Sequence, residues 1–345
     1  MTVPVECPRV ALIGYGIGGA IFHAPIIAAI PELTLTAIVT ANPERAERAA
    51  RDYASATILP SADDLWARAG DVDAVVIATP NRFHVPLAIA ALDAGLAVVV
   101  DKPFAATAAD ARRVIDEARR RNLLLTVFHN RRWDGDFLTL RKLIAGGALG
   151  DIWRFESRFE RWRPVPREGW RERGEPDEAG GLLYDLGTHL IDQALTLFGP
   201  VMDIYAELEQ RRPGVAVDDD TFVALEHASG VRSHLWMSAT AAQGGPRFRV
   251  LGSRAAYTKF GMDVQEDALR AGARPGHPGW GEDAVDRWGL LGAGDAVDPV
   301  PTECGAYEEF YRAFARSMRD GGPPPVDPED AVRVLEVIES INVGR

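Results

Sequence analysis

Short apolar runs alternate with helix-like segments over the first 128 residues. We predict strands at Val10–Ile13, Leu35–Val39, Ala74–Ala78, Ala97–Val100 and Leu123–Phe128. Helices are predicted between them at Pro43–Tyr53, Val85–Ala94 and Ala108–Arg121, and another begins at Ala20. This alternation is typical of βαβ units that build a parallel sheet. Such a sheet binds ligands at the carboxyl ends of its strands, so the residues just after each strand are the first candidates for function.

The pattern changes after Gly150. Trp153, Phe155, Ser157 and Phe159 alternate with charged residues, which indicates a strand with one apolar face. Further strands are predicted at Val201–Leu208, Thr221–Glu226, Val231–Met237, Arg247–Leu251 and Ala256–Phe260, and closing helices at Tyr307–Met318 and Glu329–Ile341. The Gly/Pro-rich stretch Ala271–Pro301 is expected to be an irregular, ordered loop. The second half therefore predicts a large, mostly antiparallel open sheet that buries one face on helices.

Three glycines follow the first strand directly. Gly14, Gly16 and Gly19 have the G-x-G-x-x-G spacing of a dinucleotide-binding turn. The first allows the tight turn, the second lets the backbone approach a pyrophosphate, and the third lets helix and strand pack closely. The helix N-terminus then offers N–H groups to the phosphates, and we expect the intervening Tyr15 and Ile17 to line the same site. The alternative is a glycine-rich turn that binds nothing.

These patterns together predict an α/β protein of two domains. Residues 1–128 are expected to form an N-terminal Rossmann domain with a doubly wound parallel sheet. Residues 129–345 are expected to form a C-terminal α+β domain for substrate binding and oligomerisation. Whether the C-terminal helices pack back on the first domain is left open.

The end of the second strand indicates which dinucleotide binds. An NAD-selective site usually has Asp or Glu there, for the ribose 2′-hydroxyl, but this chain has Thr40 and Asn42, with Arg45 and Arg48 behind them. A hydroxyl, an amide and a guanidinium can bind a 2′-phosphate, so we expect NADP as the preferred cofactor and NAD as the alternative. Either arginine could instead belong to the solvated face of the following helix.

Bulk composition excludes several classes of function. The net charge of −12 argues against sequence-independent binding to nucleic acid or to an anionic membrane. No apolar run is long enough to span a membrane and no signal-peptide pattern is present, so we expect a cytoplasmic protein. Cys7 and Cys304 do not suggest a disulfide framework, and no metal site is predicted.

Two further segments carry candidate chemistry. Lys102 follows a strand, where it could hold a substrate hydroxyl beside a nicotinamide, although it could also be a surface lysine paired with Asp101. In the helical segment Gly180–Phe198, Asp185, His189 and Asp192 fall on one stripe. An acid and an imidazole there could bind adjacent hydroxyls while the imidazole takes a proton. The alternative is a helix N-terminus with an acidic first turn and a half-buried histidine.

Four aromatic and arginine residues lie on the strand and loop that lead into the second domain. Arg161, Trp162, Arg163 and Trp170 could form a wall of the substrate site. An exposed edge whose aromatic side chains pack against a partner explains them equally well.

Several longer motifs resemble the Gfo/Idh/MocA family of nicotinamide-dependent sugar and inositol oxidoreductases over nearly the whole chain. The matching stretches are G-Y-G-I-G-G-A-I-F-H-A-P at the glycine turn, A-T-P-N-R-F-H at Ala78–His84, D-K-P-F-A at Asp101–Ala105, V-F-H-N-R-R-W-D at Val127–Asp134 and Y-D-L-G-T-H-L-I-D at Tyr184–Asp192. The F-H-A-P, R-R-W-D and Pro278–Leu290 elements look like the branch that contains NADP-preferring scyllo-inositol dehydrogenases. The family usually has Glu where this chain has Asp101.

The resemblance implies roles for individual residues. Lys102, Asp185 and His189 would form the catalytic set. Thr79, Asn81, His84 and Asn130 would line the cofactor, while Lys102, Asp185 and His189 would face the substrate. Trp162 and Arg163 are further candidates for substrate contact, from their place at the entry to the second domain. The implied reaction is hydride transfer between NAD(P) and a secondary hydroxyl of a cyclic polyol or sugar, in a homodimer or homotetramer formed through the open sheet face. A non-catalytic NADP or sugar sensor and an NAD-dependent glycoside hydrolase of the same fold are the alternatives.

Overall fold

The computed structural model describes residues 7–166, 169, 172, 174–175 and 178–343. The chain divides into two compact units, each assembled from three stretches of sequence. The first unit comprises Met1–Asn130, Gln265–Trp280 and Ala306–Val332, and the second comprises Arg131–Val264, Gly281–Gly305 and Arg333–Arg345. Within the described residues, no helix has both the length and the apolar character needed to cross a membrane.

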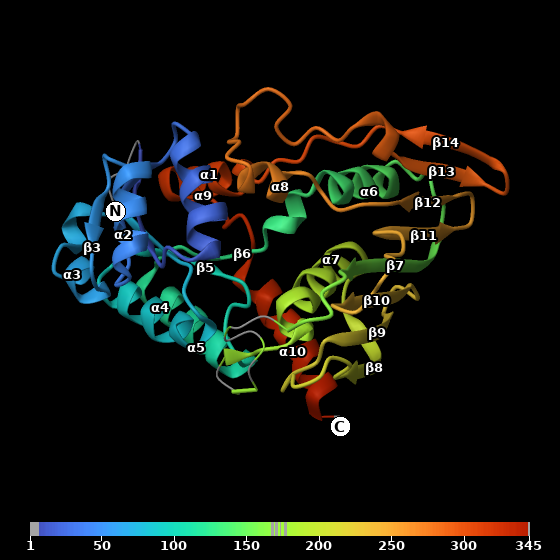
Figure 1. The fold of residues 1–345 in the computed structure, drawn as a ribbon, viewed down its shortest axis with the longest axis horizontal. Coiled ribbons are helices and arrows are strands. Elements are labelled where there is room, and N and C mark those ends of the chain that lie inside the picture. Colours follow the sequence, from blue (N-terminus) through green and yellow to red (C-terminus); the bar gives the residue numbers. More distant parts are fainter. Residues whose placement is uncertain (1–6, 167–168, 170–171, 173, 176–177, 344–345) are drawn as a thin grey trace. The chain divides into compact units, whose positions relative to one another are not determined.

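The first unit contains a parallel sheet, as predicted (Figure 1). Its strands, in the order β3-β2-β1-β4-β5-β6, are β1 (Arg9–Ile13), β2 (Thr34–Val39), β3 (Thr57–Leu59), β4 (Ala74–Ile77), β5 (Ala97–Asp101) and β6 (Leu125–Phe128). Its helices are η1 (Gly18–His23), α1 (Ala24–Ala29), α2 (Pro43–Asp52), α3 (Ala62–Trp66), η2 (Ala69–Asp71), η3 (Asn81–Phe83), α4 (His84–Asp93), α5 (Ala108–Arg121), α8 (Gln265–Arg270) and α9 (Glu308–Asp320). The edge strand β3 and the short helix α3 were not predicted.

Local sequence explains where these helices begin and end. The Asn42 side chain accepts a hydrogen bond from Arg45 N at the start of α2, and the Thr107 side chain accepts one from Asp110 N at the start of α5. At the end of α5, Asn122 takes the left-handed conformation, with φ of 55°.

The C-terminal part of the chain contributes to the core of the first unit. The rings of Phe128 in β6 and Phe310 in α9 meet edge to face, with their centroids 4.9 Å apart. The Thr126 hydroxyl also donates to the Val326 carbonyl across 2.8 Å. Residues after Gly305 therefore contribute to a core whose sheet comes from the first 130 residues.

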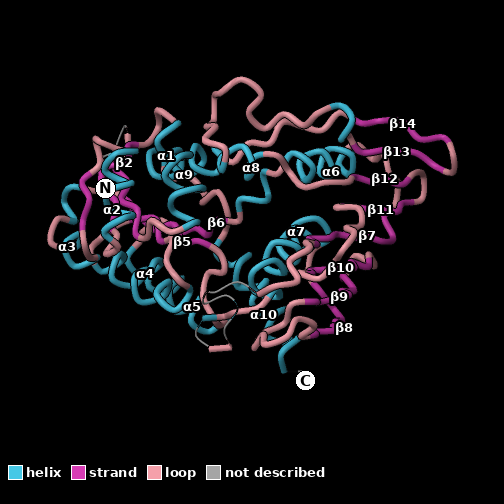
Figure 2. Tube along the Cα trace, in the orientation of Figure 1, coloured by secondary structure: helices cyan, strands magenta, loops and turns pink. Residues whose placement is uncertain are grey.

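The second unit is built on one large sheet (Figure 2). The strands β7 (Ile152–Glu160), β8 (Val201–Glu209), β9 (Asp220–His227), β10 (Arg232–Ser238), β11 (Phe248–Gly252), β12 (Ala256–Lys259), β13 (Gly289–Ala293) and β14 (Ala296–Val300) lie in the order β14-β13-β12-β11-β7-β10-β9-β8. β7 and β10 are parallel and the other neighbouring pairs are antiparallel, so the sheet is mixed but mostly antiparallel.

Helices cover one face of this sheet. They are α6 (Gly135–Ala145), the helix formed by η7 (Leu183–Gly187) and α7 (Thr188–Phe198), and the part of α10 (Pro328–Val343) that belongs to the second unit. Phe137, Leu190 and Ile338 from these helices pack with Phe155 and Val223 from the sheet. The opposite face carries exposed side chains, including Tyr205 at 58% exposure. The predicted open sheet with one buried face is confirmed.

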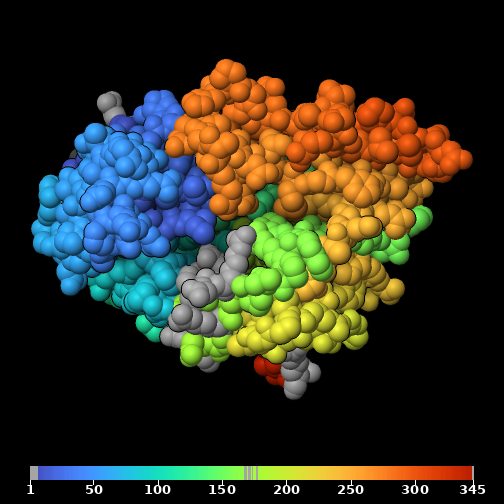
Figure 3. Space-filling view, viewed as in Figure 1, coloured from blue at the N-terminus to red at the C-terminus, as the bar shows by residue number. Residues whose placement is uncertain are grey.

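The expectation of an irregular loop over Ala271–Pro301 is wrong. This stretch contains the 3₁₀ turn η8 (Val285–Arg287) and the hairpin of β13 and β14, which extends the edge of the sheet in orange at the upper right of Figure 3. Gly294, with φ of +59°, and Asp295 form the two-residue turn. Most residues of β14 are exposed, so neither of its faces needs apolar side chains. The strand therefore lacks the alternation of apolar and polar residues by which we predicted other strands.

Candidate active site

The glycine turn follows β1, where the sequence predicts it. Gly14 has φ of +100°, and a Cβ there would lie 2.4 Å from the Ala78 carbonyl oxygen. A Cβ on Gly19 would lie 1.9 Å from the Gly14 carbonyl oxygen, so the helix can approach the turn only with glycine at this position. Tyr15 is buried, whereas Ile17 is 59% exposed at the mouth of the turn. The turn thus has the close backbone packing that a dinucleotide pyrophosphate requires.

The end of β2 lies beside this turn. The Gly14 N–H donates to the Val39 carbonyl across 3.0 Å. A Cβ on Gly16 would lie 3.7 Å from Nη1 of Arg45, so this exposed guanidinium stands next to the glycines. Thr40 accepts a hydrogen bond from Asn42 N at 3.4 Å. These three side chains therefore offer a hydroxyl, an amide and a positive charge at one end of the sheet.

Thr79, Asn81 and His84 follow β4 at the same end of the sheet. Asn81 and His84 are buried. The two ring nitrogens of His84 lie 2.9 Å from the Pro103 carbonyl and 3.0 Å from the Thr79 carbonyl. Burial lowers the pKa of His84, although the charge of Asp101 opposes this effect. The hydroxyl Oγ1 of Thr79 is buried and has no hydrogen-bond partner among the described residues.

Lys102 follows β5, and the carboxylate of the preceding Asp101 contacts two neighbouring groups. Oδ1 of Asp101 accepts a hydrogen bond from Lys102 N at 2.8 Å, and Oδ2 lies 3.5 Å from Nε2 of His23. Burial alone raises the pKa of Asp101, but the contact with His23 and the charges of Lys102 and His84 lower it below its usual value. Lys102 is half-buried, and Asn130, which ends the first of the three stretches of this unit, is buried.

Asp185 and His189 lie in the second unit, on the helix formed by η7 and α7. The helix begins with π-helical turns over Leu183–Gly187 and continues as an α-helix from Thr188. Asp185 is half-buried and His189 is 6% exposed. The predicted stripe assumed α-helical spacing throughout, but the π-helical turns change the angle between successive side chains.

The carboxylate of Asp218, just before β9, fixes the start of this helix. Oδ2 of Asp218, which precedes β9, accepts hydrogen bonds from Leu183 N at 2.8 Å and from the Thr221 hydroxyl at 2.6 Å. A Cβ on Gly181 would lie 2.0 Å from Oδ1 of Asp218, so glycine is required for this approach. A negative charge at a helix N-terminus is also favourable. Asp218 therefore positions the segment that carries Asp185.

Asp192, the third residue of the predicted stripe, pairs with an arginine. Its two carboxylate oxygens accept hydrogen bonds from Nη2 and Nε of Arg132, at 2.6 Å and 2.9 Å. Asp192 is 2% exposed, and this bidentate pair anchors the helix. The carbonyl of Arg131 also accepts a hydrogen bond from Nε2 of Gln193 at 2.9 Å. The R-R-W-D motif thus holds α7 in place.

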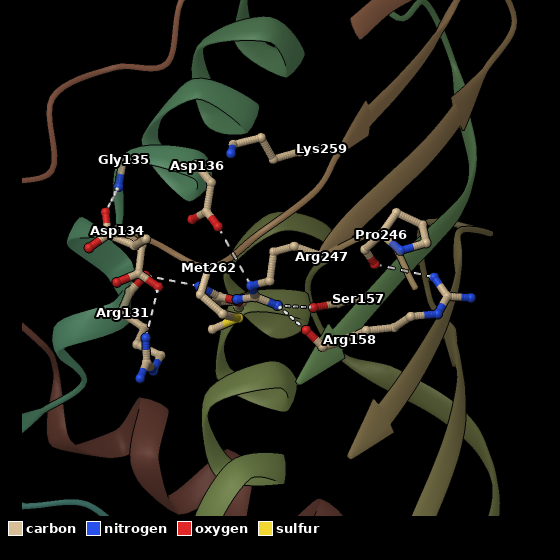
Figure 4. A network of polar contacts seen from close by, with 12 residues as sticks. Arg131, Asp134, Gly135, Asp136, Ser157, Arg158, Pro246, Arg247, Lys259 and Met262 are labelled. Carbon is tan, nitrogen blue, oxygen red and sulfur yellow. Dashed lines mark hydrogen bonds and ion pairs between the residues drawn. The ribbon is translucent and has the colours of Figure 1, made fainter. Parts of the chain in front are cut away.

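A buried polar network continues from Gln193 into the sheet. Figure 4 shows the part of it around Arg247, Ser157 and Asp136. Arg247 donates to Oε1 of Gln193 across 2.7 Å and to the Ser157 hydroxyl across 2.5 Å, and its Nε lies 3.6 Å from Asp136. Arg247 and Asp136 are almost fully buried. Burial raises the pKa of the neighbouring Asp134 well above its ordinary value, although the charge of Arg131 opposes this.

Three of the predicted wall residues, Arg161, Trp162 and Arg163, directly follow β7. Trp162 is 58% exposed and forms an isolated bridge with Thr240, and Arg163 N donates to the Ala239 carbonyl across 2.7 Å. Arg161 stacks on the Phe159 ring at 4.5 Å. Trp170 lies outside the described residues.

Sequence reasoning missed the residues that position the helix of Asp185 and His189. These are Asp218, Arg132, Gln193 and Arg247. Asp218 is 35 positions from Leu183, and Arg132 is 60 positions from Asp192, so no local spacing could pair them. The only available signal was that a family-like motif contains Arg132.

Family models match most of the chain. The N-terminal model of GFO_IDH_MocA, an oxidoreductase family with an NAD-binding Rossmann fold, matches residues 8–129. The model of its C-terminal alpha/beta domain matches residues 141–342. The chain belongs to the Gfo/Idh/MocA oxidoreductase family. Several relatives of this chain are named as dehydrogenases of inositol or of sugars. The protein is an oxidoreductase with an NAD-binding domain.

Individual relatives cover nearly the whole chain of this Gfo/Idh/MocA protein. It is 42% identical to the uncharacterized oxidoreductase YdgJ of Escherichia coli (strain K12), over 96% of this chain and 94% of that protein. It is 34% identical to the scyllo-inositol 2-dehydrogenase (NADP(+)) IolW of Bacillus subtilis (strain 168), over 97% and 93%. Among solved structures, yvaA from Bacillus subtilis superposes with a TM-score of 0.92 at 34% identity, over 98% of this chain and 96% of that one.

The first unit fits the cofactor that the family's NAD-binding domain implies. The glycine turn leaves backbone exposed where side chains would block a pyrophosphate, and the buried Oγ1 of Thr79 offers a polar group at the same end of the sheet. NAD(P) would be held there by the turn and by the residues that follow β2, β4 and β5.

Proposed function

We propose that this oxidoreductase transfers a hydride between NADP and a secondary hydroxyl of a cyclic polyol or sugar, of the inositol or aldose type. The observation that carries this proposal is the segment of Asp185 and His189, whose helix is held by Asp218 at its start and by Arg132 farther along. A helix fixed at two points suits side chains that must orient a substrate with several hydroxyl groups. The similarity to a scyllo-inositol dehydrogenase supports the same substrate class.

Each proposed catalytic residue has a distinct task. His189 accepts the proton of the reacting hydroxyl, because an imidazole nitrogen can act as a general base. The ammonium of Lys102 donates a hydrogen bond to the same oxygen and favours its negative charge. Asp185 accepts a hydrogen bond from a neighbouring hydroxyl and sets which carbon reacts. The nicotinamide supplies the hydride acceptor, and the same groups serve the reverse reaction.

The preference for NADP rests on the surroundings of the glycine turn. The 2′-phosphate would meet Thr40, Asn42 and the guanidinium of Arg45, with no carboxylate to repel it. IolW, which matches 97% of the chain, is named as an NADP(+) enzyme.

We also propose that the protein forms a homodimer or homotetramer through the open face of the large sheet. Among the described residues that face carries large exposed side chains, such as Tyr205 at 58%. It also carries Arg158, whose guanidinium lies 3.9 Å from the Trp236 ring centroid. Aromatic and arginine side chains are enriched in protein interfaces.

A panel of inositols, aldoses and sugar acids tests the proposal. Each is incubated with NADP or NAD, and the absorbance of the reduced nicotinamide is followed. We expect turnover of at least one inositol or aldose with NADP, and a loss of about a hundredfold or more in kcat for His189→Ala and for Lys102→Ala. Cofactor affinity should change little in His189→Ala. The matched control is His277→Ala, an exposed histidine outside both the proposed site and the open sheet face.

Other outcomes would point to the alternatives. Tight NADP binding without turnover of any polyol would favour a sensor. Release of free sugar from an aryl glycoside without net cofactor reduction would favour a glycoside hydrolase. A normal kcat in His189→Ala would remove this residue from the catalytic set.

A further inference from the structure

His23 is a buried titratable residue of the first unit that the proposed reaction does not use. It ends η1, the helix that follows the glycine turn, and its exposed fraction is 0%. Its ring packs against Phe128 with the centroids 4.3 Å apart. Nδ1 lies 2.5 Å from the Tyr311 hydroxyl in α9, and Nε2 lies 3.5 Å from Oδ2 of Asp101 at the end of β5. One imidazole therefore connects three separate elements of the unit.

The Tyr311 hydroxyl is the hydrogen-bond partner of Nδ1 of His23. Burial raises the pKa of Tyr311 well above its ordinary value, and the charge of Asp101 adds to this effect, so the phenol keeps its proton. The phenol can then donate to Nδ1 of His23. A neutral imidazole that accepts at Nδ1 carries its hydrogen on Nε2, and Nε2 faces the carboxylate of Asp101.

Asp101 lies between His23 and Lys102 and contacts both. Its Oδ1 accepts a hydrogen bond from Lys102 N at 2.8 Å, while its Oδ2 faces His23. Oδ2 also lies against the helix, because a Cβ on Gly18 would be only 2.9 Å away. The carboxylate therefore lies between the helix of Gly18 and His23 and the backbone of Lys102. Through its hydrogen bond it fixes the backbone that carries the Lys102 side chain.

We propose that His23 is a positioning residue for Lys102, acting through Asp101. The proposal rests on the proposed function, since it takes Lys102 to be the group that binds the substrate oxygen. Tyr311 contacts Nδ1 of His23, Nε2 of His23 faces Oδ2 of Asp101 across 3.5 Å, and Oδ1 of Asp101 accepts a hydrogen bond from the lysine backbone. The other titratable groups that act on Asp101 are Lys102 itself and His84.

The lysine content of the chain gives a direct readout that does not need turnover. The chain has three lysines, Lys102, Lys142 and Lys259. Lys142 is 71% exposed and lies in the second unit, whereas the Lys259 side chain is 1% exposed. Reductive methylation with 13C-formaldehyde therefore gives a simple NMR spectrum, in which the Lys102 signal is assigned by its loss in Lys102→Arg. Lys142 is the internal control.

The first test compares two substitutions of similar size. His23→Gln keeps an amide that can donate to Asp101, and His23→Leu removes every polar contact. We expect the Lys102 signal to shift in His23→Leu and to stay near its wild-type position in His23→Gln, while the Lys142 signal is unchanged in both. An unshifted Lys102 signal in His23→Leu would overturn the proposal.

The second test separates polar contact from packing. His23→Ala should lower kcat for scyllo-inositol with NADP by about tenfold, with a smaller change in the KM for NADP, which is within the range of a lost positioning contact. Added imidazole should restore much of this activity, because a buried cavity can bind a small ring of matching shape. Toluene fills a similar volume without polar atoms and should not restore it. Equal rescue by both compounds would show that His23 only fills space.

The two proposals fail in different ways. If Lys102→Ala turns over scyllo-inositol at the wild-type rate, the proposed function of Lys102 is wrong. If Lys102→Ala is inactive while His23→Leu is as active as wild type and its Lys102 signal is unmoved, only the role of His23 is wrong.

Discussion

A buried lysine fixes the segment that leads into the β13–β14 hairpin. Lys259 is 1% exposed, and its ammonium lies 2.8 Å from Oδ2 of Asp283. It also donates to the carbonyls of Phe260 and Arg287, across 2.8 Å and 2.7 Å. All three ammonium hydrogens therefore have an acceptor. We expect this one side chain to contribute strongly to the stability of the second unit.

Lys259→Met tests this expectation, because methionine keeps the length of the side chain and removes its charge. The change leaves two carbonyls and one carboxylate oxygen without their donor. Breaking a buried ion pair from one side costs about 3–5 kcal/mol. Asp283 keeps its contact with Arg287 at 3.0 Å and the hydroxyl of Thr302 at 3.3 Å, so we expect a value near the lower end, about 3 kcal/mol.

The assay is urea unfolding followed by circular dichroism. The matched control is Lys142→Met, which breaks the 2.5 Å contact between Lys142 and Glu303, side chains that are 71% and 39% exposed. Exposed pairs contribute about 0–1 kcal/mol, so the control should move the unfolding midpoint little. The reasoning would be refuted if the two variants shifted the midpoint equally.

Three further predictions concern the first unit. Thr40→Asp should turn the cofactor preference toward NAD, because the new carboxylate repels a 2′-phosphate; the ratio of kcat/KM for the two cofactors measures this, and an unchanged ratio would contradict it. Gly19→Ala should abolish cofactor binding measured by calorimetry, since the Cβ would lie 1.9 Å from the Gly14 carbonyl. Burial raises the pKa of Asp73, but its hydrogen bonds to Arg9 outweigh burial, and the pKa is lowered overall. The pair therefore stabilises the fold at pH values above the ordinary aspartate pKa, and this stabilisation is lost as the pH falls through the lowered pKa. Asp73→Asn should therefore make the melting temperature less dependent on pH below about 4, and an unchanged acid dependence would count against this pair.

The sequence was most informative where function and local conformation need the same residue. Gly14 and Gly19 are required both by the backbone packing of the turn and by a pyrophosphate, so their spacing predicted the turn and its place after β1. The parallel sheet of the first unit was predictable for a related reason. Strands buried on both faces, such as β4, are continuous apolar runs.

The sequence was least informative where distant residues determine local geometry. Asp192 has the right helical spacing for a ligand, but Arg132 binds it from another element. The π-helical turns of η7 coincide with the contact between Asp218 and Leu183, which only the folded chain can bring together. The β13–β14 hairpin has an exposed outer strand, so its residues show no alternation that could have revealed it.

The interleaving of the two units has a consequence for biosynthesis. The first unit needs residues up to Val332, because α9 supplies Phe310 and Tyr311 to its core. A growing chain cannot finish this unit until Val332 has left the ribosome, even though its sheet ends at Phe128. Stopping translation after the sixth strand would yield a polypeptide with an uncovered aromatic surface, a substrate for chaperones and proteases and not a working nucleotide-binding fragment.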